Sequence, residues 1–554
     1  MRHLRLFLLA LATLVNGLLF AQDSQKDLER LMRCRGEYYF TLNVETASDI
    51  QALTRLCSVD KTDGITVVCY ADQSQYEDLL RRGFQPVLQT PPSMLEEAVM
   101  WDGSDRAGYD WNSYPTYEAY EAMMFQFAAD HPDQCEIISL GTLPSGHKIL
   151  IAHLNNGSDY GKPKFLYTST IHGDETTGWI MMLRLIDYLL ENPDAPEVQN
   201  VMERLDLFIG PLSNPDGTYY GGNHTVGGAR RNNANNRDLN RNFPDPHGSP
   251  HPDGYPYQTE TEWAMQFAED YPFTMAANFH GGSEVINYPW DNTYTLHADD
   301  DWYRLIAREY ADLCHEIDST YMDGFDNGIT NGAVWYMIAG GRQDYMNGYH
   351  ECREVTIECS NAYTPPASQL PLFWSYNKNA LFAYMNQCLY GIHGTVTDSV
   401  TGQPLKATVT IAGHDDQFSS VSSHLPAGDY HRPIKGGTYD LTYNCEGYFS
   451  KTITVSVNDH ETVVQDIALL PIDWSLPESH STFMVYPNPN KGSFVVNAEG
   501  EFSYTIFNSL GQQILSGKSN GNTPIVCPDL KRGVYFLHLK SENGNKVEKL
   551  YIEK

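Results

Sequence analysis

The middle of the chain alternates strand-like apolar runs with amphipathic, helix-like stretches. The apolar runs are 136–140, 148–154, 164–170, 205–212 and 273–279, and the helix-like stretches include 117–131, 177–190 and 260–270. This alternation predicts an α/β unit over residues 106–390, with a mixed central sheet and helices on both of its faces. Ligands bind to such sheets at the carboxyl ends of the strands, so we expect the chemistry there.

Different patterns flank this unit. Residues 22–105 mix strand and helix patterns and predict a small N-terminal α/β unit. Residues 391–472 alternate at a period of two, which is typical of an all-β sandwich, and residues 483–554 predict a second one. The segment 473–482 is interpreted as the linker between them. A chain of 554 residues is long for a single core and suggests about three or four domains.

The first 21 residues have the pattern of a secretory signal peptide. Arg2 and Arg5 form a positively charged start, and residues 6–20 are an apolar run too short to span a bilayer comfortably. Ala21 is a small residue that suits a cleavage site. We therefore expect an exported, soluble mature protein.

Charge and cysteine content narrow the function classes further. The formal net charge of −33 argues against nucleic acid as a partner. In an exported protein the ten cysteines meet an oxidising compartment, where we predict a Cys314–Cys352 disulfide. The spacing of the other cysteines leaves their pairing open, and oligomeric state is equally open.

Two histidines and one glutamate follow predicted strands. His172 and Glu175 come just after the run 164–170, and His280 comes directly after the run 273–279. Two imidazoles and one carboxylate make a catalytic zinc site that leaves a coordination position for water. A lone His-x-x-Glu arises by chance in a long chain, so it indicates a zinc site only if the surrounding sequence supports one.

Six blocks of sequence around these residues support a zinc site. They are HGDE at 172–175, NPDG at 214–217, RNNANNRDLNRNFPD at 231–245, HGGSEVINYPWD at 280–291, TNGAVWYMIAGGRQDY at 330–345 and EVTIECS at 354–360. In content and order they resemble the zinc metallocarboxypeptidases, most closely the branch that contains carboxypeptidases D, E, M and N. The resemblance implies one zinc ion held by His172, Glu175 and His280, and removal of the last residue from peptides or proteins.

The resemblance also implies the acid–base groups. Asp238 matches the carboxylate that holds the first histidine ligand in the correct tautomer. Glu358 matches the general base, which takes a proton from the attacking water and passes it to the leaving amine. By alternation alone Glu354 is a competitor on the same strand face, and the family register selects Glu358.

Arg231 matches the arginine that stabilises the tetrahedral oxyanion. Arg230 and Arg237 are alternatives within the same motif, so this assignment depends on the distance to Asn240. Asn240 and Arg241 match the pair that grips the terminal carboxylate of the substrate, a task that suits the planar guanidinium. Tyr336 matches the mobile tyrosine that closes over the bound chain end.

Substrate preference is expected to depend on Asp291. It stands eleven residues beyond His280, where the D/E/M/N branch has an aspartate that meets basic side chains. Gln343, just before Asp344, also fits that branch and is expected to bind the substrate together with Asp291, so we predict release of C-terminal Lys and Arg. Trp290 replaces the usual Phe and is expected to narrow the pocket. An enzyme of broad or apolar specificity and a non-catalytic peptide-binding protein are the alternatives.

The flanking units carry further resemblances. Residues 391–472 are similar to the transthyretin-like module that follows the catalytic domain in the D/E/M/N branch. Residues 483–554, with YPNPNKG at 486–492 and NSLGQ at 508–512, resemble the C-terminal domain read by the type IX secretion system. This resemblance implies a secreted or surface-attached protein that meets that machinery. Residues 22–105 are either a propeptide that covers the active site, as some carboxypeptidases have, or a retained accessory domain.

Overall fold

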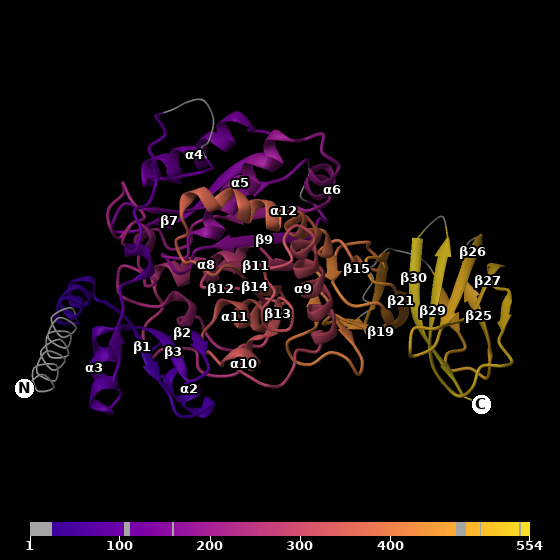
Figure 1. Ribbon diagram of the computed structural model, residues 1–554. Coiled ribbons are helices and arrows are strands. Elements are labelled where there is room, and N and C mark those ends of the chain that lie inside the picture. The colour runs from indigo at the N-terminus through magenta and orange to yellow at the C-terminus, as the bar shows by residue number, and fades with distance from the viewer. Residues whose placement is uncertain are drawn as a thin grey trace, which may run out of the picture.

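The computed structural model describes the chain in several stretches, which are residues 25–104, 111–157, 160–472, 483–498, 500–541 and 544–553. The predicted signal peptide (1–21) and the predicted linker (473–482) lie outside the described residues. The stretches form an N-terminal unit, a central α/β unit and two C-terminal β units that follow one another along the chain (Figure 1).

Within the described residues, the central unit is built on an eight-stranded sheet in the order β13-β12-β14-β11-β9-β10-β8-β7. Strands β9, β10, β11 and β14 run parallel to their neighbours in the middle, while the β7–β8, β8–β10 and β12–β14 pairs are antiparallel. The predicted mixed sheet is therefore confirmed. The strands are β7 (Cys135–Thr142), β8 (Lys148–Leu154), β9 (Lys164–Ser169), β10 (Asp206–Gly210), β11 (Met275–His280), β12 (Ser283–Tyr288), β13 (Ile329–Asn331) and β14 (Arg353–Ser360).

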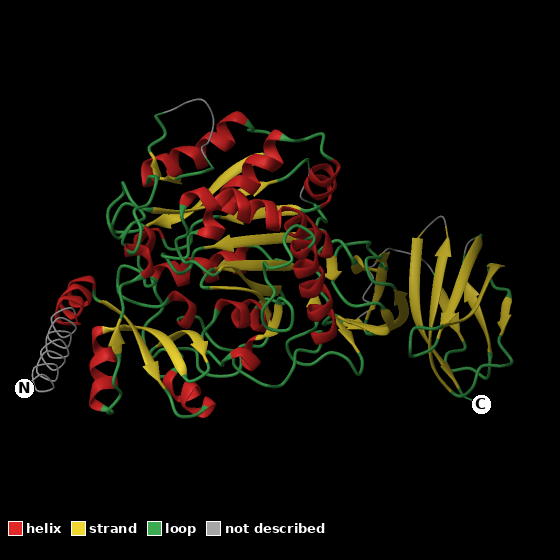
Figure 2. Ribbon diagram, viewed as in Figure 1, coloured by secondary structure: helices red, strands yellow, loops and turns green. Residues whose placement is uncertain are grey.

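Helices cover both faces of this sheet, as predicted (Figure 2). Successive side chains of a strand point to opposite faces. Accordingly Phe165 and Tyr167 of β9 join the core under one set of helices, while Leu166 joins the core on the other face. The first set is α4 (Tyr117–Asp130), α5 (Thr177–Glu191), α6 (Pro196–Arg204), α9 (Asp300–His315) and α12 (Leu370–Gln387); the second is α8 (Thr259–Asp270) and α11 (Arg342–Tyr349).

The predicted Cys314–Cys352 disulfide is wrong. All ten cysteines lie within the described residues and are free thiols. Cys314 is buried in the core on the α9 face of the sheet, whereas Cys352 is buried in the core on the α8 face. The sheet separates the two sulfur atoms.

The N-terminal unit is a small α/β fold, as the sequence predicted. Its sheet has the order β2-β3-β1-β4 and is backed by α2 (Ala47–Leu53) and α3 (Gln73–Arg81). The strands are β1 (Glu37–Asn43), β2 (Ser58–Asp63), β3 (Thr66–Asp72) and β4 (Val87–Leu88). Strand β2 was not predicted from the sequence, because its sequence SVDKTD is mostly polar and has no apolar alternation.

Both C-terminal units are β-sandwiches, as predicted. In the first, the sheets β18-β15-β23-β20 and β17-β16-β19-β21 enclose one apolar core, and in the second the sheets are β24-β25-β28 and β27-β26-β29-β30. The first sandwich contains β15 (Gly391–Asp398), β16 (Thr408–Ile411), β17 (Val421–Ser422), β18 (Asp429–Arg432), β19 (Gly437–Asn444), β20 (Tyr448–Phe449), β21 (Lys451–Val457), β22 (Thr462–Val464) and β23 (Ile467–Pro471). The second contains β24 (Met484–Tyr486), β25 (Ser493–Asn497), β26 (Glu501–Phe507), β27 (Gln513–Asn520), β28 (Pro524–Val526), β29 (Gly533–Ser541) and β30 (Gly544–Ile552).

Among the described residues, none of the helices combines the length and the apolar character needed to cross a membrane.

Candidate active site

The candidate site lies at the carboxyl ends of three neighbouring strands. β9 ends at Ser169, and Thr170 adopts a left-handed backbone conformation (φ 57°) that turns the chain into the loop carrying His172 and Glu175. His280 is the last residue of β11, and the parallel β11–β14 register aligns it with Glu358. The sheet therefore brings together groups that are far apart in the sequence.

His172, Glu175 and His280 form a group whose ligand atoms all lie within 4.8 Å of one another. Glu175 Oε1 lies 2.7 Å from His172 Nδ1, and Glu175 Oε2 lies 2.8 Å from His280 Nδ1. The three side chains are buried, and the two Nδ1 atoms face each other at 3.1 Å. Two imidazole nitrogens and a carboxylate that converge in this way are a ligand set suited to zinc, so the residues present fit the ion.

The outer nitrogens of both imidazoles also have partners. His172 Nε2 lies 3.1 Å from Asp238 Oδ1, and His280 Nε2 lies 2.9 Å from the side-chain amide nitrogen of Asn278. Burial opposes ionisation of Asp238, but the positive charges of Arg231 and His172 outweigh it and hold the pKa of Asp238 well below its usual range. Asn278 was missed by sequence reasoning, although it stands two residues before His280 and so shares its face of β11.

The two candidate bases, Glu358 and Glu354, both lie on β14, but their surroundings differ. Glu358 lines the pocket beside the histidines, and its Oε2 has no hydrogen-bond partner among the described residues. Burial raises its pKa well above the usual value, and the charges of Glu175 and Asp60 add to the shift. Glu354 instead pairs with Arg342 at 3.1 Å and does not line the pocket. The geometry therefore agrees with the choice of Glu358.

Of the three neighbouring arginines, Arg231 lines the pocket. Its Nη1 lies 3.3 Å from Glu175 Oε1, and its Nε donates to Asp238 Oδ2 at 3.0 Å. Arg230 donates to backbone carbonyl groups outside the pocket, and Arg237 forms an ion pair with the N-terminal unit. The guanidinium of Arg231 is thus next to the metal-ligand group.

Asn240, Arg241 and Tyr336 line the same pocket. Asn240 and Arg241 lie in the short helix η2 (Leu239–Arg241), whose N-cap is Asp238. Asp238, which contacts His172, therefore also begins the turn that presents Arg241. Asn240 Oδ1 accepts a hydrogen bond from the backbone N–H of Arg342 at 2.8 Å. Tyr336 directly follows α10 (Gly332–Trp335).

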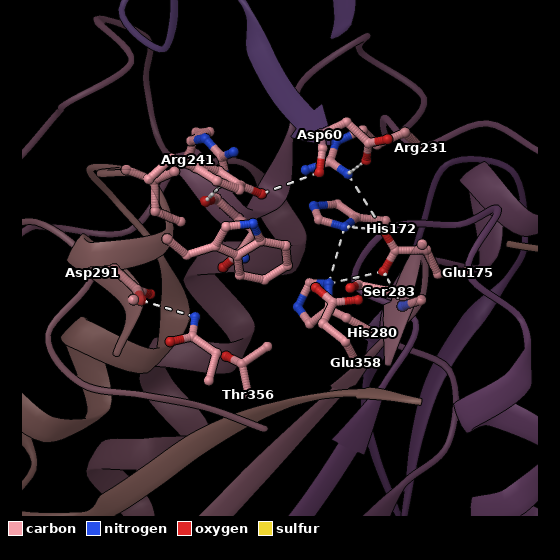
Figure 3. Close-up of a pocket in the computed structure, with 18 residues that line it drawn as sticks. Asp60, His172, Glu175, Arg231, Arg241, His280, Ser283, Asp291, Thr356 and Glu358 are labelled. Atoms are coloured by element: carbon pink, nitrogen blue, oxygen red, sulfur yellow. Dashed lines mark hydrogen bonds and ion pairs between the residues drawn. The ribbon is translucent and has the colours of Figure 1, made fainter. Parts of the chain in front are cut away.

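Asp291 lies across the pocket from the histidines (Figure 3). Its Oδ1 accepts hydrogen bonds from Asn287 Nδ2 and Gln343 Nε2, each at 3.0 Å. Burial raises the pKa of Asp291 to about 6. At Gly332 a Cβ atom would lie only 1.8 Å from Asp291 Oδ1, so the glycine leaves the space that the carboxylate occupies.

Two expectations about this side of the pocket need correction. Gln343 does not line the pocket but holds Asp291 from behind. Trp290 does not narrow the pocket either, because its ring is buried against His247 and His297 and points away from the lining.

The N-terminal unit inserts β2 into this pocket. Asp60 Oδ1 lies 3.1 Å from Arg231 Nη1 (Figure 3). The Asp60 carboxylate also accepts a hydrogen bond from the hydroxyl of Tyr363. The Asp60 carbonyl oxygen accepts from the Tyr336 hydroxyl at 3.3 Å, and the Val59 carbonyl oxygen accepts from Arg241 Nη2 at 3.3 Å. β2 thus contacts the residues expected to bind a substrate.

The rest of the contact between the N-terminal unit and the central unit is largely polar. Ser58 Oγ donates to Asp238 Oδ2 at 2.7 Å, and Tyr70 donates to Asp174 at 2.8 Å. Glu37 accepts from the Asn232 backbone N–H at 2.8 Å. Beneath the unit the pocket retains about 40 Å³. A volume of that size corresponds to a few water molecules.

The sequence comparisons point to one family. Residues 120–380 match the zinc carboxypeptidase family. The chain is 34% identical over 371 residues to carboxypeptidase D of Mus musculus; this match covers 63% of this chain and 26% of that protein. It is also 34% identical over 369 residues to carboxypeptidase SOL1 of Arabidopsis thaliana; that match covers 65% of this chain and 72% of that protein. The chain belongs to the zinc carboxypeptidase family. This family uses zinc, and the group of His172, Glu175 and His280 could hold that ion.

The two C-terminal units of this zinc carboxypeptidase match known domains too. Residues 391–470 match a carboxypeptidase regulatory-like domain, and residues 484–553 match a secretion system C-terminal sorting domain, which implies secretion or attachment to the cell surface. The crystal structure of the carboxypeptidase A from Helicoverpa armigera aligns with a TM-score of 0.49 at 17% identity, over 63% of this chain and 96% of that one. The chain spans about a quarter of the length of the carboxypeptidase D relatives it matches.

Proposed function

We propose that this protein is a secreted zinc metallocarboxypeptidase that releases the C-terminal residue of peptides or proteins, with a preference for Lys and Arg. The observation that carries the proposal is a single pocket with three kinds of group. It contains the zinc-ligand group, a buried carboxylate on the neighbouring strand (Glu358), and the Asn240–Arg241 pair that suits a terminal carboxylate.

The pocket offers a base, an oxyanion partner and a site for a Lewis acid. When bound at His172, Glu175 and His280, zinc supplies a charge that polarises the scissile carbonyl and acidifies water. Glu358 takes the proton from the attacking water at its unpaired Oε2 and passes that proton to the leaving amine. Arg231 donates to the oxyanion that develops on the scissile carbonyl.

Asn240 and Arg241, which line the same pocket, restrict cleavage to the C-terminal residue of the substrate. The Arg241 guanidinium donates in parallel to both oxygens of a terminal carboxylate, and Asn240 adds an amide donor. An internal peptide bond offers no carboxylate at this position. Tyr336 lines the same pocket and is proposed to cover the bound residue and exclude water.

The preference for basic residues rests on Asp291. A buried carboxylate favours a cationic side chain in the same pocket and leaves an apolar side chain poorly matched. Asn287 and Gln343 fix the orientation of the Asp291 carboxylate while leaving Oδ2 to receive the substrate. Relatives named carboxypeptidase D and carboxypeptidase M are consistent with this assignment.

A set of four peptides that end in Arg, Lys, Phe or Glu tests the proposal. We expect release of Arg and Lys at rates far above the other two. Faster release of Phe would favour the alternative of broad or apolar specificity. Zinc-loaded protein that binds the peptides and cleaves none of them would support the peptide-binding alternative and reject catalysis.

We further infer that the N-terminal unit is inhibitory, which favours the propeptide interpretation over a retained accessory domain. The support is the set of contacts made by Val59 and Asp60 with Arg241, Arg231 and Tyr336, and the small volume left beneath them. Limited proteolysis that removes residues up to about 104 is expected to raise activity. An accessory domain predicts no gain.

We also propose that residues 483–554 direct the protein to the type IX secretion machinery. The match of 484–553 to a sorting domain supports this partner. Deletion of the second sandwich is expected to retain the enzyme in the periplasm, whereas secretion of the deleted chain would reject the proposal.

A further inference from the structure

The first β-sandwich reaches the back of the proposed specificity pocket. The loop between β16 and β17 carries Phe418, whose ring centroid lies 5.5 Å from that of Trp290 and 5.2 Å from that of His247. Both contacts are edge-to-face, the arrangement that aromatic rings prefer. Trp290 is fully buried and directly precedes Asp291 in the chain. A residue of one domain therefore packs directly behind the pocket of another.

Trp290 and Asp291 also hold the segment that carries Tyr336. The Trp290 carbonyl oxygen accepts from the Ala333 backbone N–H at 2.9 Å, and the Asp291 carbonyl oxygen accepts from the Ile338 N–H at 3.2 Å. These bonds fix the segment on both sides of the tyrosine. The backbone of Trp290 and Asp291 thus holds both the proposed specificity residue and the segment that carries Tyr336.

The loop that carries Phe418 is fixed by buried charges. Asp299 of the central unit accepts from Arg432 Nη1 at 2.8 Å and from Arg353 Nη2 at 2.9 Å, and its other oxygen lies 2.7 Å from His414 Nε2. Arg432 also pairs with Asp415 at 2.8 Å, within the loop itself. Because an unpaired buried charge is costly, this network holds the loop in one position.

We propose that Phe418 is a positioning residue for the specificity pocket, through which the first β-sandwich sets the location of Asp291. His247 and His297 cover other parts of the Trp290 ring, at centroid distances of 4.6 and 5.1 Å, and both belong to the central unit. Phe418 is the contact that depends on the docked sandwich. This inference rests on the proposed function in one respect, namely that Asp291 lies in the pocket that selects the substrate.

The test is Phe418→Ala in the full chain, assayed before and after limited proteolysis with peptides that end in Arg and in Phe. We expect KM for the Arg peptide to rise about two- to tenfold, the range that loss of one aromatic pair implies, with kcat nearly unchanged. The ratio of Arg to Phe cleavage is expected to fall by the same factor. Phe418→Tyr keeps the ring and is expected to restore wild-type KM.

Ser422→Ala is the matched control. Ser422 lies in the same sandwich and contacts Glu351 of the central unit through its hydroxyl at 2.9 Å, so its loss loosens the same interface at a different point. A specificity role predicts no change in the Arg-to-Phe ratio for this variant. Equal effects of Phe418→Ala and Ser422→Ala, or an equal loss of kcat on both peptides, would reject the positioning role.

Two further outcomes are separable. If Phe418→Ala does not fold, as judged by zinc content and circular dichroism, Phe418→Leu replaces it and the same rise in KM, smaller in size, is required. If the wild-type enzyme shows no preference for Arg, the proposed basic specificity fails. The positioning role then stands only if the Phe418 variant raises KM for the preferred peptide, and it is rejected otherwise.

Discussion

Replacing Asp60 with alanine is expected to release part of the inhibition by the N-terminal unit. In the intact chain this carboxylate lies against Arg231 and the hydroxyl of Tyr363, inside the pocket that a substrate needs. The substitution leaves the metal ligands and the Asn240–Arg241 pair unchanged. Its effect should therefore be confined to the equilibrium between the docked and undocked forms of the unit.

The expected magnitude follows from these contacts. A hydrogen bond to a charged group contributes roughly 1.5–3 kcal/mol. Burial raises the pKa of Asp60, opposed mainly by the charge of Arg231, so the lost hydration of the carboxylate offsets part of this gain. We expect a net effect of about 1.5 kcal/mol, which corresponds to about a tenfold shift of the equilibrium. While the undocked form remains the minority, hydrolysis by the intact chain should rise by the same factor.

The assay compares the intact and the proteolytically trimmed chain on one peptide ending in Arg. Asp60→Ala should raise the rate of the intact chain and leave the trimmed rate at the wild-type value. Asp78→Ala is the control, because Asp78 pairs with Arg81 and Arg82 within the same unit. Equal rates for intact wild type, Asp60→Ala and Asp78→Ala, with a faster trimmed enzyme, would show that Asp60 does not maintain inhibition.

The remaining predictions concern the pocket itself. Asp291→Ala should lower kcat/KM for peptides ending in Arg roughly 30-fold or more, since it removes one partner of a buried charge pair, and unchanged selectivity would place the determinant elsewhere. The pKa of Asp291 is raised to about 6, so its charged form is lost as the pH falls through that value. KM for the Arg peptide should therefore rise below about pH 6. A KM that does not change across this range would contradict the assignment. Glu358→Gln should lower kcat about 10²- to 10⁴-fold with zinc content unchanged, and a near-normal kcat would exclude it as the base. Chelation should abolish activity and lower the melting temperature, with zinc restoring both; activity in metal-free protein would refute the mechanism.

The local pattern of the chain was sufficient for much of the site. Apolar runs and amphipathic stretches predicted the sheet and its helices, and the ordered blocks predicted that His172, Glu175 and His280 meet. Strand ends in such a sheet converge on one edge, so residues that follow different strands come together without further information. The choice of Arg231 over its neighbours also agrees with the structure, because motif spacing fixes which side chain enters the pocket.

Contacts between units were decided by tertiary structure alone. Asp60 reaches Arg231 across 171 positions from a strand whose polar sequence has no strand pattern, so nothing local indicated it. Phe418 meets Trp290 across a domain boundary, a contact that no local pattern indicated. The expectation that Trp290 narrows the pocket was wrong because its ring packs against His247, His297 and Phe418, away from the pocket lining. Sequence patterns report which face of an element is buried, because burial repeats with the period of the helix or strand. They do not report which distant surface covers that face, since this depends on how whole domains dock.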